Sequence, residues 1–183
     1  MPDALHIEQI RKTLIVRFTR PEIRNPLSIP VLDQLHELVD ELSSDDWIDN
    51  VIFTGTAESF ASGADLREIA AVTPEAAPEF ARYGQSLMAK IEALRQNTIA
   101  AVNGFCFGGA LDLTLVCDWR IASPRAKFAH PGAGLGIITG WGGTQRLPRL
   151  IGEAKALEMF LTAKRVGADE ALRIGLVDEI SDI

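Results

Sequence analysis

Two segments of the chain place small residues directly between a predicted strand and a predicted helix. The first runs VIFTGTAESFASGADL from Val51 to Leu66, and the second runs IAAVNGFCFGGALDL from Ile99 to Leu113. Glycine at such a turn lets the backbone approach a ligand closely, and the first amides of a helix have no partner within that helix. If amides from both turns converge on one point, they can bind a developing oxyanion, as acyl-transfer and enolate chemistry require. Taken alone, each turn is more often a place where glycines simply let a helix pack on a strand.

The glycine-rich motifs of several other enzyme classes are missing. In the segment from Pro131 to Gly143, Ile137 stands where a GxGxxG motif begun by Gly132 and Gly134 would have its third glycine. The sequence has neither a GxxxxGK[ST] nor a GxSxG motif. Dinucleotide-binding, P-loop and serine-hydrolase functions are therefore disfavoured.

The composition narrows the class of protein further. The 183 residues are 47% hydrophobic and carry a net charge of −7, which predicts one domain with an ample core and no nucleic-acid partner. Cys106 and Cys117 lack CxxC spacing, so we expect two buried thiols and no zinc or redox site. No signal-like run or long apolar span occurs, so we expect a soluble cytoplasmic protein without a membrane partner.

Hydrophobic periodicity predicts strands that alternate with helices, the pattern of the α/β class. A period of two predicts a hairpin over residues 6–18 with its turn at Arg11-Lys12, and Ser28 is the expected cap of the helix that follows. Further strands are expected at 51–53, 99–102, 119–122, 127–129 and 176–180. Further helices are expected at 74–95, 108–117, 154–161 and 168–174, with one long loop over 131–143.

Several motifs, in one order, resemble the crotonase (enoyl-CoA hydratase/isomerase) superfamily from about residue 8 to the end. They are RPEIRNPL, FTGTAESFASGADL, AAVNGFCFGGALDLTLVCDWRIAS and GWGGTQRLPRLIG, followed by a helix and GLVDEI. The resemblance implies a spiral of ββα units that forms trimers or hexamers and binds an acyl-CoA thioester without a metal or redox cofactor. It implies oxyanion-binding amides at Ala64 and Gly109. It also implies that CoA passes Arg24, Ala64, Asp65 and Leu66, with the thioester reaching Gly109.

The sequence departs from the family where side chains would carry the chemistry. Hydratases of the family have two glutamates, and the corresponding positions here are Asp112 and Gly132. Asp112 follows Gly109 by one helical turn and is the best remaining acid or base, although an aspartate there also suits the helix dipole. His130 precedes Gly132 by two residues and is a second candidate for proton transfer, or simply a packed histidine.

Three further comparisons within the superfamily leave the reaction open. Double-bond isomerases normally rely on the second glutamate, which is absent at Gly132. Dienoyl-CoA isomerases have an aspartate at position 112 but also need carboxylates at Gly132 and Gly140. Naphthoate synthases share the glycine at 132 but have an aspartate where this chain has Thr139.

Two functions are therefore compatible with the sequence. One is an enzyme that works through a stabilised thioester enolate, and the other is a crotonase-like scaffold that binds acyl-CoA with little or no catalysis. The family usually continues past GLVDEI with a helical segment, whereas residues 1–183 are expected to form only the core domain.

Overall fold

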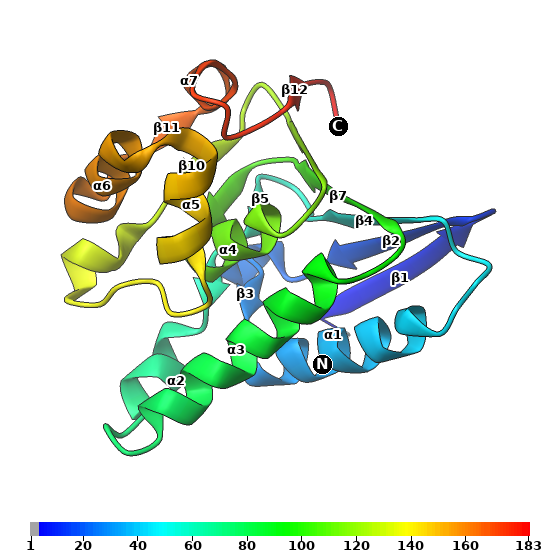
Figure 1. Cartoon of the computed structure of the whole chain (residues 1–183), viewed down its shortest axis with the longest axis horizontal. Helices are drawn as coiled ribbons and strands as arrows, with labels where there is room; N and C mark the ends of the chain where they lie inside the picture. The colour runs from blue at the N-terminus through cyan, green and yellow to red at the C-terminus, as the bar shows by residue number, and fades with distance from the viewer. Residues whose placement is uncertain (1–3) are drawn as a thin grey trace.

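The chain alternates between two β-sheets as it proceeds (Figure 1). The computed structural model describes residues 4–183. The strands are β1 (Leu5–Ile10), β2 (Thr13–Phe18), β3 (Pro26–Leu27), β4 (Asn50–Thr54), β5 (Ser59–Ala61), β6 (Gly63–Ala64), β7 (Asn97–Val102), β8 (Phe105–Phe107), β9 (Trp119–Ala122), β10 (Lys127–Ala129), β11 (Val166–Gly167) and β12 (Glu179–Ile180). The helices are α1 (Ile29–Ser43), α2 (Leu66–Ala71), α3 (Ala77–Glu92), α4 (Gly109–Leu115), α5 (Gly143–Ile151), α6 (Glu153–Thr162) and α7 (Ala168–Arg173), with 3₁₀ turns η1 (Pro21–Ile23) and η2 (Pro131–Leu135).

The order of the strands shows that the chain forms a spiral. The larger sheet has the order β1-β2-β4-β7-β9-β12, and only its first pair is antiparallel. The smaller sheet has the order β11-β10-β8-β5. Each of β4, β7 and β9 in the larger sheet is followed at once by β5, β8 or β10 in the smaller one, so every turn of the chain adds a strand to both sheets. This arrangement confirms the α/β class and the expected ββα spiral.

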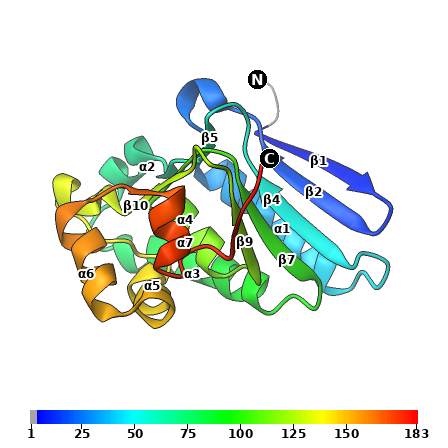
Figure 2. The ribbon, with the colours of Figure 1, turned by 90° about the horizontal axis from the view of Figure 1, so that it is seen from above.

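Helices α1 and α3 pack together and cover one face of the larger sheet (Figures 1 and 2). The apolar stripe predicted for α1 is buried as expected. In α3, Leu87, Met88 and Ile91 are fully buried, and Gly84 is buried with them. These two helices pack on the sheet whose central strands β4 and β7 lead into the glycine-bearing turns.

Several predictions of local structure were confirmed, and others were wrong. The hairpin turn falls at Arg11-Lys12, and both cysteines are buried. Ser28 occupies the N-cap position of α1, but its side chain makes no capping bond. The Glu68 carboxylate of α2 accepts the Ile29 amide at 2.8 Å instead. A carboxylate from another element therefore satisfies the end of this helix.

The glycine-rich stretch and its surroundings contain more regular structure than predicted. Residues 131–135 form η2 rather than open loop, and α5 was missed altogether. Helix α5 begins at Gly143 and contains Pro148, two residues that usually interrupt helices, yet its Leu147 is completely buried. Helix α3 starts at Ala77 rather than near Pro74, and the last strand is shorter than expected.

Within residues 4–183, no helix combines the length and apolar character needed to cross a membrane. In the same range, no three His, Cys, Asp or Glu side chains gather closely enough to hold a metal ion.

Candidate active site

The two glycine-bearing turns meet in space. Gly63 has a left-handed φ of 84°, and a Cβ added to it would lie 2.7 Å from the amide nitrogen of Gly109 and 2.6 Å from the carbonyl oxygen of Phe107. Only glycine allows that approach, because a side chain there would collide with backbone atoms. Gly109 is the first residue of α4, and Ala64 directly follows Gly63. The turn that carries Ala64 therefore lies against the first amide of α4.

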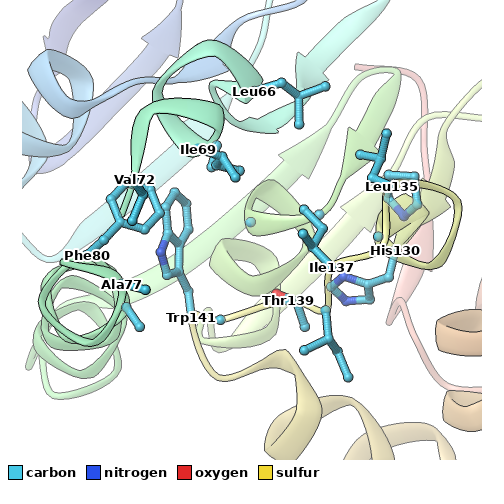
Figure 3. Close-up of a pocket in the computed structure, with 18 of the residues that line it drawn as sticks. Leu66, Ile69, Val72, Ala77, Phe80, His130, Leu135, Ile137, Thr139 and Trp141 are labelled. Atoms are coloured by element: carbon cyan, nitrogen blue, oxygen red, sulfur yellow. The ribbon is translucent and has the colours of Figure 1, made fainter. Parts of the chain in front are cut away.

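Both turns border an apolar cavity of about 310 Å³ (Figure 3). Ala64 and Gly109 line it, together with Leu66, Ile69 and Val72 from the segment around α2. The opposite wall comes from the segment of residues 130–141 that leads into α5. A mainly apolar cavity with a few convergent polar groups is the usual form of a small-molecule site.

A buried carboxyl group lies behind the wall of this cavity. Asp112, one turn into α4, has no exposed surface. Thr139, which lines the cavity, donates a hydrogen bond from its hydroxyl to Oδ2 of Asp112. Burial raises the pKa of Asp112 to about 7, although the Thr139 hydroxyl acts in the opposite direction. Both the protonated and the ionised form of this carboxyl group are therefore accessible near neutral pH.

A buried imidazole stands beside the carboxyl group. Nε2 of His130 lies 3.6 Å from Oδ1 of Asp112, and the ring packs 5.0 Å from that of Phe160, centroid to centroid. Among residues 4–183, neither ring nitrogen of His130 nor Oδ1 of Asp112 has a hydrogen-bond partner. Burial lowers the pKa of His130 to about 4, so the ring is neutral at physiological pH. Leaving buried polar atoms without hydrogen-bond partners costs free energy. We therefore expect a ligand or a water molecule to form hydrogen bonds with them.

Comparison with known proteins decides the family. A model of the enoyl-CoA hydratase/isomerase family matches residues 9–182. A crotonyl-CoA hydratase from Syntrophomonas wolfei is 41% identical over 175 residues, which are 95% of this chain and 67% of that protein. This chain belongs to the enoyl-CoA hydratase/isomerase family.

Solved structures agree with the assignment to the enoyl-CoA hydratase/isomerase family. DspI from Pseudomonas aeruginosa superposes with a TM-score of 0.93 at 37% identity, over 98% of this chain and 73% of that one. An enoyl-CoA hydratase from Bacillus anthracis gives a TM-score of 0.92 at 34% identity, over 98% of this chain and 70% of that one. The resemblance to the crotonase superfamily and its fold is thus confirmed, and the chain spans about two thirds of the length of the relative described above.

The structure brings some of the predicted site residues of this family together and leaves others apart. Ala64, Leu66, Gly109 and His130 line one cavity. Asp112 lies just behind it, in contact with Thr139.

The other two predicted residues lie outside the cavity lining. Arg24 is exposed and has a left-handed φ of 66°. Asp65 caps α2 by accepting the amide of Arg67, and its carboxylate also pairs with the Arg67 guanidinium at 2.6 Å.

Two residues of the site escaped the sequence-based prediction. Thr139 was noted only as a departure from a family pattern, although its hydroxyl lines the cavity and donates a hydrogen bond to Asp112. Trp141 was noted only as part of a motif, although its indole lines the cavity and is almost completely buried. A lone tryptophan in a glycine-rich segment was the available signal, because so large a side chain needs small neighbours.

Proposed function

We propose that this protein acts on an acyl-CoA thioester by moving a proton at the carbon next to the thioester carbonyl. The observation that carries the proposal is the contact between the two turns, which sets Ala64 beside the first amide of α4 on the cavity wall. Amides at these two positions would hold the carbonyl oxygen as negative charge develops on it. The N-terminus of α4 adds a favourable dipole for that charge.

Asp112 is the group that would take and return the proton. A carboxyl group with a pKa of about 7 is suited to both steps at neutral pH. The proton would leave the carbon, the electron pair would move to the thioester oxygen, and the Thr139 hydroxyl would pass the proton to Asp112. Neutral His130 lines the same cavity and would orient the polar group that enters or leaves in the reaction.

The CoA portion would extend outward from Leu66, which lies half exposed at the mouth of the cavity. Arg24 and Asp65 stand on the segments that flank this mouth, and their contacts to CoA would be made largely through the backbone. The chemistry is acid–base catalysis at an activated thioester, so it requires no metal or redox cofactor. CoA takes part as a portion of the substrate.

A scaffold that binds acyl-CoA without turning it over is the second candidate. Its support is Gly132, which supplies no carboxylate at the position of the second glutamate. A side chain cannot easily be added there, because a Cβ on Gly132 would lie 2.4 Å from the carbonyl oxygen of Ile137. Any catalysis must therefore proceed without a carboxylate at position 132.

Exchange of the substrate proton with solvent distinguishes the two candidates. The protein is incubated in D₂O with butyryl-CoA, and mass spectrometry measures deuterium incorporated next to the thioester, with a sample lacking protein as the reference. Crotonyl-CoA is tested in parallel for the addition of water. We expect deuterium incorporation to depend on the protein. Binding measured by calorimetry without exchange or conversion would establish the scaffold, and absence of binding would refute both.

We also propose that the protein assembles as a homotrimer or as a hexamer of two trimers, as the family resemblance implies. Light scattering coupled to size-exclusion chromatography measures this directly. A stable monomer at micromolar concentration would contradict it.

A further inference from the structure

The indole of Trp141 fills a space that two glycines provide for it. A Cβ added to Gly84, in the middle of α3, would lie 2.2 Å from the indole Nε1. A Cβ added to Gly109, at the start of α4, would lie 2.4 Å from the six-membered part of the same ring. Neither position tolerates a side chain while the indole is present. Because glycine inside a helix is unfavourable, Gly84 is explained by the ring that it accommodates.

The indole also forms part of the cavity. Trp141 lines it beside Phe80, with the two ring centroids 6.1 Å apart, and Ile69 and Val72 complete that side (Figure 3). The ring therefore fills the gap between α3 and α4 and also forms part of the cavity wall. It also touches Gly109, one of the two residues proposed to hold the thioester oxygen.

We propose that Trp141 determines the length of the acyl group by closing the inner end of the cavity, so that short and medium chains fit and long chains do not. This inference rests on the proposed function, because it takes the cavity to be the acyl site. The cavity of about 310 Å³ lies at the small end of the ~300–1,000 Å³ that is usual for ligand sites. A cavity of this size suits a short or medium acyl chain better than a long one.

Calorimetry with butyryl-, octanoyl- and dodecanoyl-CoA tests the proposal on the wild-type protein and on Trp141→Ala. Affinity of the wild type should rise by up to about fourfold for each buried methylene as far as octanoyl-CoA, and should then level off. In Trp141→Ala, the ratio of dodecanoyl-CoA to butyryl-CoA affinity should increase at least ~10-fold, because additional methylenes enter the space left by the ring. The control is Trp119→Ala, since Trp119 is exposed on β9 and lies outside the cavity lining.

A second measurement leaves Trp141 in place. In the double variant Trp47→Phe, Trp119→Phe, the fluorescence comes from Trp141 alone, since the chain has three tryptophans. Octanoyl-CoA should shift this emission clearly more than butyryl-CoA does at equal saturation, because its chain reaches the indole. Equal shifts, or an unchanged length profile in Trp141→Ala, would overturn the role of Trp141 while leaving the proposed function intact. Failure of every thioester to bind the wild type would overturn the proposed function, and this inference with it.

Discussion

The hydroxyl of Thr139 lies between the cavity and the carboxyl group of Asp112, to which it donates a hydrogen bond. The two residues are 27 positions apart in the sequence and come from different elements, α4 and the segment before α5. This contact connects the buried carboxyl group to the cavity.

Replacing the carboxyl group of Asp112 by an amide should abolish most proton transfer. We expect Asp112→Asn to lower turnover, or deuterium exchange, by ~10²-fold or more, because general acid–base catalysis contributes about that much. Binding of CoA thioesters should change little. The matched control is Asp40→Asn, since Asp40 is exposed on α1 and pairs with Lys90 at the surface. Full activity of Asp112→Asn would end the assignment and make His130 the next residue to test.

Removing the Thr139 hydroxyl should interrupt the relay to Asp112, and so lower the rate by ~10²-fold, and should shift the pH dependence of the activity that remains. The hydroxyl lowers the pKa of Asp112, so Thr139→Val should raise that pKa further and move the acidic limb of the rate profile to higher pH. Thr139→Ser keeps the hydroxyl and should restore the wild-type profile. A profile that is the same in Thr139→Val and the wild type would show that the contact is structural only.

The same carboxyl group should make the stability of the protein depend on pH. In the unfolded chain Asp112 releases its proton near its ordinary pKa of 3.8, whereas in the folded state it does so near 7. The folded state is therefore progressively destabilised as pH rises from about 4 to 7. Relative to the wild type, Asp112→Asn should gain about 2 to 3 kcal/mol of unfolding free energy between pH 5 and pH 8. Urea unfolding at the two pH values measures this, and a constant difference would show that Asp112 is ionised at both.

The ionisation of His130 should change the stability of the protein in the opposite direction and over a narrower range of pH. Its pKa falls from 6.5 to about 4 on folding, so the stability it contributes is complete above pH 6.5 and is lost as pH falls toward 4. In the wild type, acidification also increases the stability that Asp112 contributes, and this increase offsets the loss from His130. We therefore expect Asp112→Asn to lose stability on acidification through this range more steeply than the wild type. If His130→Gln in that background leaves the slope unchanged, another group is responsible.

Substitution by alanine should destabilise the protein at Gly132 but not at Gly140. A Cβ on Gly132 would meet the Ile137 carbonyl at 2.4 Å, while one on Gly140 would have only the Cβ of Ala81 nearby, at 4.0 Å. Gly132→Ala should therefore cost about 1 to 3 kcal/mol of stability, as overpacking does, and Gly140→Ala should be neutral or slightly stabilising. Thermal unfolding of the pair provides the comparison. Equal stability of the two variants would show that η2 adjusts, and only then would Gly132→Glu be a fair attempt to restore a second carboxylate.

The sequence by itself indicated the family and the two glycine-bearing turns of the site. The ordered motifs, with glycine at 63 and 109, indicated the spiral fold and the two turns, since a left-handed φ or a close backbone approach leaves a clear trace in residue type. Periodicity located α1 and α3 because their buried faces recur at helical spacing. Helix α5 was missed because Gly143 and Pro148 usually interrupt helices, although Leu147, Leu150 and Ile151 recur at helical spacing.

Tertiary structure alone decided which side chains share a site. Asp112 was recognisable as a candidate acid, but its separation from the cavity by Thr139 depends on how the segment before α5 folds back over α4. The depth of the cavity likewise depends on Trp141 lying between Gly84 and Gly109, which come from two different helices. Contacts of this kind join residues far apart in the chain, and they arise from the packing of whole elements, so no local pattern of residues could have revealed them.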